Sequence, residues 1–196
     1  MSYRFELRRK LFHMCFGSVI VALLYSGVFN AWHLFVLLVF GGLLSLVSTR
    51  VNIPIVAWFL YRFEREGETF PGRGPIFFVF SALLVVQLFD MSIALASLMV
   101  LTLGDPIAHL VGKFFGRLKN VYTTAHKNIE GMLLGFIVAF LGAWLFVDPL
   151  LAFLGAFFGM FAEVIEFQLN KKHVDDNLIV PLVAATVMYI VRTYLI

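Results

Sequence analysis

The stretch "TLGDPIAHLVGKFFGRLKN", residues 102–120, follows an apolar segment and combines small residues with charged ones at a fixed spacing. Small residues recur every four positions at Gly104, Ala108, Gly112 and Gly116, and polar ones follow one position later at Asp105, His109, Lys113 and Arg117. Residues four apart share a helix face. The stretch therefore predicts one helix with a small-residue ridge beside a polar stripe, and Pro106 predicts a loosened backbone near its start.

The composition of the whole chain indicates a polytopic membrane protein. Of 196 residues, 61% are hydrophobic and 14% are charged, whereas about a quarter of a typical soluble domain is charged. The many aromatic residues are not interleaved with a basic groove, which speaks against a nucleic-acid partner. A single cysteine excludes an internal disulfide and a CxxC metal site.

Seven apolar segments approach the length needed to cross a bilayer, about 17–25 residues for a helix. They are 11–29, 31–48, 75–89, 91–112, 129–147, 149–168 and 178–196. The segment 53–64 is too short to cross and ends in charges, which predicts an interfacial helix. We therefore expect an all-α transmembrane bundle of about seven spans, forming one integral-membrane domain over 1–196.

The distribution of basic residues predicts the orientation of this bundle. With the N-terminus in the cytoplasm, only Arg192 among the 15 lysines and arginines lies toward the opposite side. The turns expected outside, "SGVFNAW", "QLFDMS" and "FVDPL", contain neither lysine nor arginine. The positive-inside rule supports this orientation. A multi-pass protein with its active site at the cytoplasmic face is therefore expected.

The N-terminal segment "ELRRKLFH", residues 6–13, carries a second polar face. At about 100° per residue, Arg8 points away from the face that holds Glu6, Arg9, Lys10 and His13. A structural ion-pair face and a phosphate-handling face are both compatible with this pattern.

The polar stripe of residues 105–117 favours a functional role for Asp105 over a packing role, because charged side chains within a membrane span are costly. For His109 both interpretations stay open.

Two further polar clusters lie nearer the C-terminus. One is Lys127, Glu130 and Gly131 at the start of a span; the other is Glu163, Glu166 and Asn170 on one helix face, followed by Asp175, Asp176 and Asn177. Helix capping needs only one of the last three, and adjacent carboxylates favour a divalent cation. Arg73, between two glycines, is interpreted as part of a turn before the third span.

Together the clusters supply acids for a hard cation, lysine and arginine for phosphate, and glycines for close approach. These are the groups on which phosphoryl transfer depends, because positioning and charge neutralisation perform most of its catalysis. The chain contains neither a Walker A motif nor GxGxxG, so it does not match the soluble nucleotide-binding folds.

The motifs "ELRRKLFH", "GDPIAHLVGKFFGR", "KNIEG" and "AEVIEF…DDNLIVPL" resemble, in order and spacing, the dolichol kinase/phytol kinase family of CTP-dependent membrane lipid kinases. The resemblance implies a nucleotide site with Arg9, Lys10, Gly104, Gly112, Lys113, Gly116, Arg117, Lys127 and Gly131. It implies catalytic roles for Asp105, Lys127, Glu130 and His13, and a metal site with Asp105, Glu130, Asp175 and Asp176. Glu6, His109, Glu163, Glu166 and Asn177 are further polar candidates. Asn128 departs from the family, where Ser or Thr is usual.

The expected activity is transfer of the γ-phosphate of CTP to the hydroxyl of a membrane lipid alcohol, such as a polyprenol or dolichol, a phytol-like prenol or diacylglycerol. Mg²⁺ or another divalent cation is the expected cofactor, and Asp105, Glu130 and His13 are all candidates for the general base. A cytidylyltransferase that forms a CDP-lipid is the alternative enzyme, and a small transporter is the alternative from another class. The small-residue ridge fits packing within one chain or in a homodimer.

Overall fold

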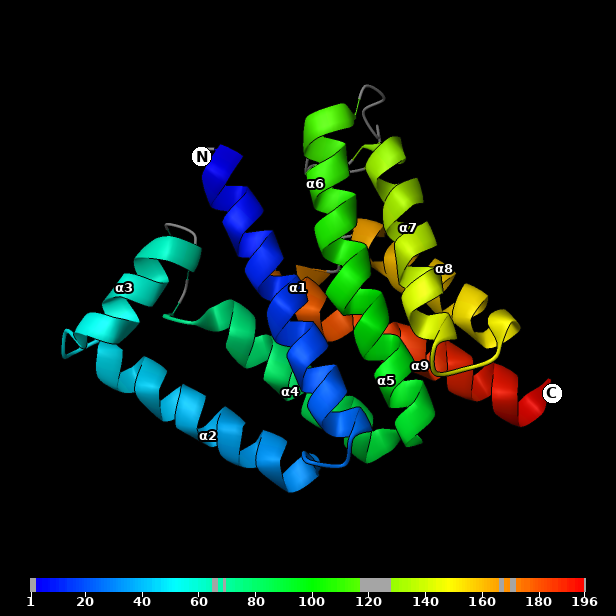
Figure 1. Cartoon of the computed structure of the whole chain (residues 1–196), viewed down its shortest axis with the longest axis horizontal. Coiled ribbons are helices and arrows are strands. Elements are labelled where there is room, and N and C mark those ends of the chain that lie inside the picture. The colour runs from blue at the N-terminus through cyan, green and yellow to red at the C-terminus, as the bar shows by residue number, and fades with distance from the viewer. Residues whose placement is uncertain are drawn as a thin grey trace.

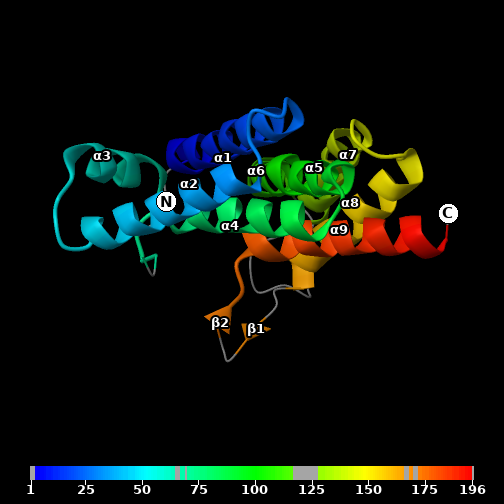
Figure 2. The same ribbon diagram turned by 90° about the horizontal axis from the view of Figure 1, so that it is seen from below.

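The part of the chain that the structure describes is almost entirely helical. The computed structural model describes residues 3–64, 67–68, 70–116, 128–165, 168–169 and 172–195. Its elements are α1 (Tyr3–Tyr25), α2 (Ala31–Ser48), α3 (Pro54–Phe63), α4 (Arg73–Leu88), α5 (Met91–Met99), the π-helical turn η1 (Val100–Gly104), α6 (Asp105–Phe115), α7 (Ile129–Trp144), α8 (Pro149–Ile165), β1 (Gln168–Leu169), β2 (Lys172–His173) and α9 (Asp176–Tyr194) (Figure 1). The all-α prediction is confirmed, apart from the antiparallel pair β1–β2, which projects from the helices (Figure 2).

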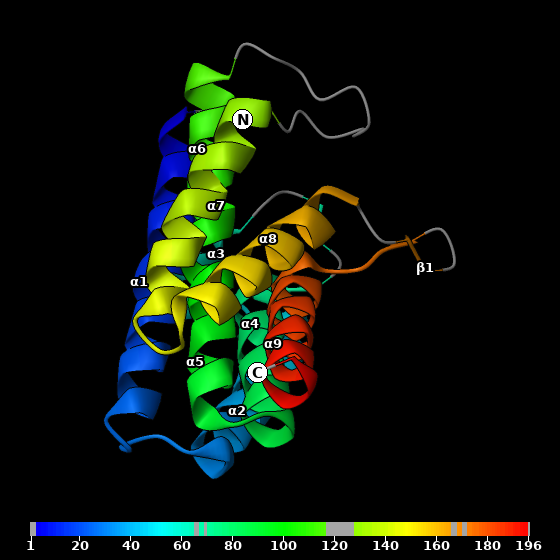
Figure 3. The same ribbon diagram turned by 90° about the vertical axis from the view of Figure 1, so that its right-hand side faces the viewer.

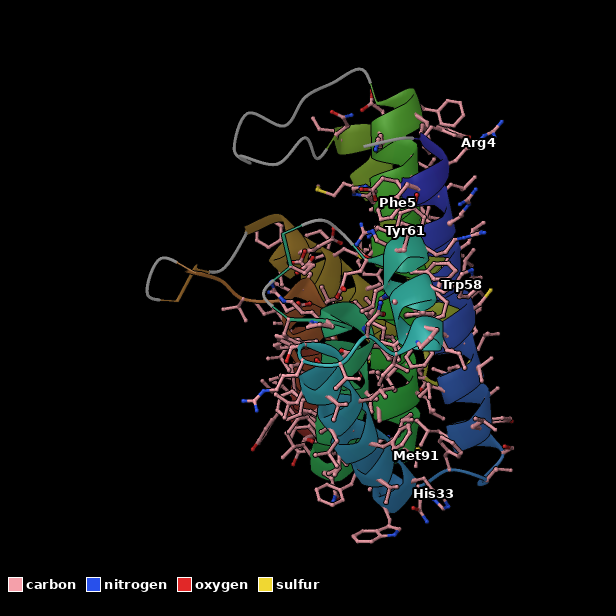
Figure 4. The ribbon with its side chains drawn as sticks, turned by 90° about the vertical axis from the view of Figure 1, so that its left-hand side faces the viewer. Arg4, Phe5, His33, Trp58, Tyr61 and Met91 are labelled. Atoms are coloured by element: carbon pink, nitrogen blue, oxygen red, sulfur yellow. The ribbon has the colours of Figure 1, made fainter. Side chains whose placement is uncertain are left out.

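Each segment predicted as a span contains a helix. Three described helices are long and apolar enough to cross a membrane, namely Ala31–Ser48, Met91–Phe115 and Asp176–Tyr194, whereas α4, α7 and α8 are apolar but shorter. Figure 4 shows Arg4 at one end of the bundle and His33 and Met91 at the opposite end. The chain is thus a helical membrane protein, while the count of seven spans and the cytoplasmic N-terminus stay predictions.

The centre of the bundle is the continuous helix formed by α5, η1 and α6. The most apolar part of Met91–Phe115 is 67% buried, whereas the corresponding share of α2 is 11%. Helix α2 lies at the edge of the bundle and packs on α4. Helices α1 and α9 contact α5 from opposite sides (Figure 2), and α8 leans against α9 (Figure 3). Ile93, Leu98 and Leu101 are completely buried. The helix that carries the opening stretch of the sequence is therefore also the core of the fold.

A π-helical turn interrupts this central helix immediately before Asp105. In a regular α-helix, Pro106 would lack the N–H that binds the carbonyl of Thr102, and its ring would clash with that carbonyl. A π turn accommodates this by widening the helix by one residue, and such turns are frequent at functional sites. The disturbance that Pro106 predicts is confirmed, and it begins at Val100.

The predicted short helix over 53–64 is α3, which begins with Pro54 at its first turn. Ten residues rise only about 15 Å, half of the hydrocarbon thickness. Trp58 and Tyr61 lie on the side of α3 that faces the viewer in Figure 4, and they are 57% and 85% exposed. Tryptophan and tyrosine are typical of the membrane–water interface, which supports the predicted interfacial position.

Candidate active site

The two polar faces near the start and middle of the chain meet between α1 and α6, which lie side by side (Figure 1). The Lys10 Nζ lies 2.8 Å and 2.6 Å from the two carboxylate oxygens of Asp105. These side chains are 7% and 13% exposed. Two charges held so far from water compensate each other, and removal of either would leave the other buried alone.

A second charged group lies on the same two helices, around Glu6. Its Oε2 accepts hydrogen bonds from Arg9 at 3.0 Å and 3.3 Å and lies 3.3 Å from His109 Nε2. The Glu6 side chain is only 4% exposed, whereas Arg8 is exposed, as predicted. The predicted face of α1 is thus confirmed as a face, and it turns toward the polar stripe of α6.

His13 extends this cluster by one helical turn. Its ring meets the ring of Phe78 edge-on, with the two ring centroids 5.4 Å apart. The buried Nε2 of His13 has no hydrogen-bond partner within the described part of the chain, and the same holds for Thr102 Oγ1. Buried polar atoms are nearly always paired. Each of these two atoms could therefore accept a hydrogen bond from a ligand or a water molecule, or donate one to it.

The small-residue ridge packs against α7, as predicted. A methyl group added at Gly131 would meet the carbonyl oxygen of Ala108, and would lie 2.6 Å and 2.7 Å from the N and Cα of Gly112. One at Gly135 would lie 2.8 Å from the carbonyl oxygen of Gly104. Small residues let helix backbones approach this closely. The ridge thus seats α6 within the chain, which leaves a homodimer as a separate prediction.

Two further residues of the predicted site, Lys113 and Glu130, lie near the junction of α6 and α7. Lys113 is exposed in the last turn of α6, and Glu130 lies in the first turn of α7. The side-chain amide of Asn128 donates to the carbonyl oxygen of Gly112. Asn128 therefore ties α7 to α6, and this contact gives the unusual residue a structural role. The predicted residues Arg117 and Lys127 lie outside the described residues.

The C-terminal polar cluster begins with a helix cap. Asp175 Oδ1 accepts from the Asn177 backbone N–H at 3.1 Å and from its side-chain amide at 2.8 Å. The other carboxylate oxygen lies 3.0 Å from Arg73 Nε. Asp176 opens α9. The capping interpretation is therefore confirmed for Asp175. The same side chain also forms an ion pair with Arg73, which the sequence did not predict.

The predicted acidic face of α8 is only partly described. Glu163 is buried at 4% exposure in the last turns of this helix. α8 ends at Ile165, short of the face expected to run through Glu166 to Asn170. Glu166 and Asn170 themselves lie outside the described residues.

Replacing Arg73 by glutamine is expected to destabilise the protein by about 1–2 kcal/mol at neutral pH, because it leaves a largely buried carboxylate without its cation. Burial raises the pKa of the Asp175 carboxyl, an effect that Arg73 opposes. Because the folded pKa is raised, protonation stabilises the fold at low pH, and this stabilisation is lost as the pH rises through that pKa. The deficit of Arg73→Gln should therefore shrink as the pH falls toward 4. Thermal unfolding in detergent across this range measures it.

The matched control is Arg50→Gln, since Arg50 is exposed and its only hydrogen bond among the described contacts is made by its backbone N–H. Equal unfolding temperatures for the two variants at neutral pH would contradict a role for the Arg73–Asp175 pair.

The fit of the site to a divalent cation rests on its carboxylates. Within the described ranges, no three His, Cys, Asp or Glu side chains are grouped closely enough to hold a metal ion by themselves. Mg²⁺ in phosphoryl-transfer sites is commonly held by one or two carboxylates, water and the phosphates of the substrate. Asp105, which already binds the cationic Lys10, fits that requirement. Glu130, Asp175 and Asp176 stay predicted ligands.

Two contacts of the structure had no prediction from sequence. The ion pair between Arg73 and Asp175 joins α4 to the start of α9, although the segment around Arg73 reads as a simple turn. Thr102 lies in η1 and, with Phe78, closes off the space beside Gly17. Gly17 follows His13 by four residues and so lies on the same face of α1. This spacing was the sequence signal that the inward face of α1 continues beyond its charged residues.

Among the proteins that are similar to this chain, three match it over more than nine-tenths of its length. An uncharacterised protein of Methanocaldococcus jannaschii is 30% identical over 93% of this chain and 92% of its own length. The CTP-dependent diacylglycerol kinase 1 of Schizosaccharomyces pombe is 25% identical over 97% of this chain and 95% of its own length. The chloroplastic phytol kinase 1 of Arabidopsis thaliana is 29% identical over 94% of this chain and 66% of its own length. No protein-family model matches the chain, and no solved structure matches it significantly.

These similarities agree with the resemblance that the four motifs carry. Diacylglycerol kinase and phytol kinase are named among the relatives, whereas the resemblance to dolichol kinase stays an expectation. The similarity to the archaeal protein extends over nearly all of both chains. The chain therefore belongs to the family of the M. jannaschii protein, a lipid-kinase-like family with CTP-dependent diacylglycerol kinase and phytol kinases as distant homologues.

Proposed function

We propose that this protein is a CTP-dependent kinase that transfers the γ-phosphate to the hydroxyl of a membrane lipid alcohol at the cytoplasmic face. The observation that carries the proposal is the buried pair of Lys10 and Asp105 between α1 and α6, beside a backbone approach that only glycine permits. A buried lysine and aspartate can neutralise a phosphate and a cation, the two requirements of phosphoryl transfer.

Each side chain of the cluster has a role in this proposal. Lys10 turns from Asp105 toward the nucleotide phosphates, and Arg9 and Lys113 neutralise their remaining charge. Asp105 would hold Mg²⁺ together with phosphate oxygens, and the ion would supply neutralisation of the phosphate charge. His13 offers its buried, unpartnered Nε2 to the acceptor hydroxyl and takes up its proton. Glu130 and Asp105 stay alternatives for this proton acceptor.

The identity of the acceptor alcohol is tested directly. Purified protein in detergent is given Mg²⁺, γ-labelled CTP and one alcohol at a time from a panel containing phytol, a polyprenol, dolichol and diacylglycerol. We expect label in the lipid, release of CDP, and loss of both when EDTA removes the divalent cation. Detergent micelles without protein provide the control.

Two outcomes would contradict this proposal. If none of the alcohols becomes labelled with Mg²⁺ present, the protein is not a lipid-alcohol kinase of this kind. If α-labelled CTP labels a lipid phosphate and pyrophosphate is released, the reaction is cytidylyl transfer.

A further inference from the structure

A cleft lies outside the charged cluster, between α1, α3 and the start of α4. Its volume is about 60 Å³. One wall is apolar, with Phe12, Phe59, Leu60 and Phe63, and the other is polar, with Arg9, Glu64 and Glu68. A cavity with one apolar and one polar wall suits a ligand that has a polar end and a hydrocarbon body.

The apolar wall is formed by the inner face of α3 packed on α1. The ring of Phe12 lies 5.0 Å from that of Phe59 and 4.9 Å from that of Phe63. The opposite face of the same helix carries the exposed Trp58 and Tyr61, which lie on its outer side in Figure 4. A helix that is aromatic on both faces and expected at the membrane surface places this wall where a lipid chain can reach it.

The polar wall selects against a nucleotide. Glu64 accepts a hydrogen bond from the backbone N–H of Gly72 at 2.6 Å, and Glu68 pairs with Arg73 at 3.2 Å. Arg9 is paired with Glu6 and Glu68 with Arg73, so Glu64 is the carboxylate of this wall for which the described contacts include no cation, and it disfavours a triphosphate. An uncharged hydroxyl, in contrast, can donate a hydrogen bond to a carboxylate oxygen.

Arg9 connects this cleft with the candidate active site. Its side chain lines the cleft and also binds Glu6, whose carboxylate lies 3.3 Å from His109 on α6. The cleft therefore adjoins the cluster that holds Lys10 and Asp105, with the Arg9 side chain between them. A ligand whose polar end reaches Arg9 lies beside the groups proposed to handle phosphate.

We propose that this cleft binds the acceptor alcohol, with its hydroxyl end at Arg9 and its first carbons against Phe12, Phe59, Leu60 and Phe63. This inference rests on the proposed kinase function. The cleft is too small for a whole lipid, so the rest of the chain extends into the bilayer along α3. Entry between α1 and α3 brings the hydrocarbon body in on the side of α1 away from α6, so that only the hydroxyl end, at Arg9, approaches the nucleotide proposed to bind at α6.

The decisive variant is Leu60→Trp, which fills the cleft from its apolar wall. We expect the KM for the lipid alcohol to rise by at least about tenfold, since steric discrimination in apolar pockets has this size, with the KM for CTP unchanged. The matched control is Tyr61→Trp, an equally bulky replacement at the neighbouring, outward-facing position. Equal KM values for the alcohol in the two variants would overturn the proposed site.

A second measurement does not depend on catalysis. A long-chain alcohol with a diazirine near its hydroxyl is photolysed with the protein in detergent, and the labelled peptides are mapped. We expect labelling of 54–63 and of the segment around Arg9, lost with excess unmodified alcohol and in Leu60→Trp, but retained in Tyr61→Trp. Competed labelling of this cleft without any phosphorylated lipid would support the lipid site and contradict the kinase function. Phosphorylated lipid with labelling confined to other helices would overturn the site and leave the kinase function standing.

Discussion

Asp105→Asn is expected to abolish phosphoryl transfer, with a fall of at least about 10²–10³ in kcat, the size typical for loss of one preorganised charged group. The carboxylate of Asp105 binds Lys10 through both oxygens and is the proposed cation ligand. An amide keeps the shape of the side chain but removes the negative charge. Labelled CTP and the preferred lipid alcohol measure the effect.

A loss of stability must be separated from a loss of chemistry, because the pair is buried. Asp105→Asn alone leaves the Lys10 ammonium without its carboxylate, which costs about 3–5 kcal/mol when a buried pair is broken. The double variant Lys10→Met/Asp105→Asn removes both charges and should recover much of that stability. We expect it to remain inactive. Full activity in Asp105→Asn, or recovery of activity together with stability in the double variant, would show that the pair only holds α1 against α6.

Gly131→Ala, on the face of α7 that packs against the small-residue ridge, is expected to destabilise the protein more than a methyl group added to any glycine of the ridge itself. The new Cβ would lie 2.6 Å from Gly112 N and would meet the Ala108 carbonyl oxygen, so backbone rather than a flexible side chain must move. Overpacking of this kind costs typically about 1–3 kcal/mol, and more where the backbone must shift. Thermal unfolding in detergent measures the change.

Two alanine replacements serve as matched controls. At Gly112 the nearest atom to a new Cβ is 3.6 Å away, an ordinary contact, so Gly112→Ala should be close to neutral. At Gly42, within α2, nothing lies within 4 Å, and alanine should stabilise by up to about 1 kcal/mol through helix propensity. If Gly131→Ala unfolds at the same temperature as Gly112→Ala, then α6 and α7 are not as close as the structure places them.

The elements and their faces could be predicted because both follow from local periodicity. The four-residue spacing from Gly104 to Gly116 predicted the contact surface of α6, and the spacing of Glu6, Lys10 and His13 predicted the inward face of α1. Membrane-spanning helices are especially easy to locate in a sequence, because each requires an apolar segment long enough to cross the bilayer. Of the polar stripe, Asp105 and His109 meet side chains of α1 and Lys113 is exposed at the end of α6, whereas Arg117 lies outside the described residues.

The pairing of residues distant along the chain could not be predicted. Lys10 and Asp105 are separated by 95 positions, and nothing in one sequence specifies which acid on α6 or α9 a lysine on α1 will meet. Arg73 likewise reads as part of a loop, although its position opposite Asp175 follows from the packing of α4 against α9. Such pairs depend on tertiary arrangement, which periodicity does not encode.

The π turn η1 has a consequence for the arrangement of α5 and α6. One extra residue within a turn rotates everything that follows by about 100° relative to an uninterrupted α-helix. Helix α5 is surrounded by α1, α4, α7, α8 and α9, whereas α6 contacts α1 and α7, so the π turn sets which face of α6 meets those two helices. The direction in which Asp105 points is set by the number of residues between Met99 and Asp105, so loss of any one of them would turn the carboxylate away from Lys10.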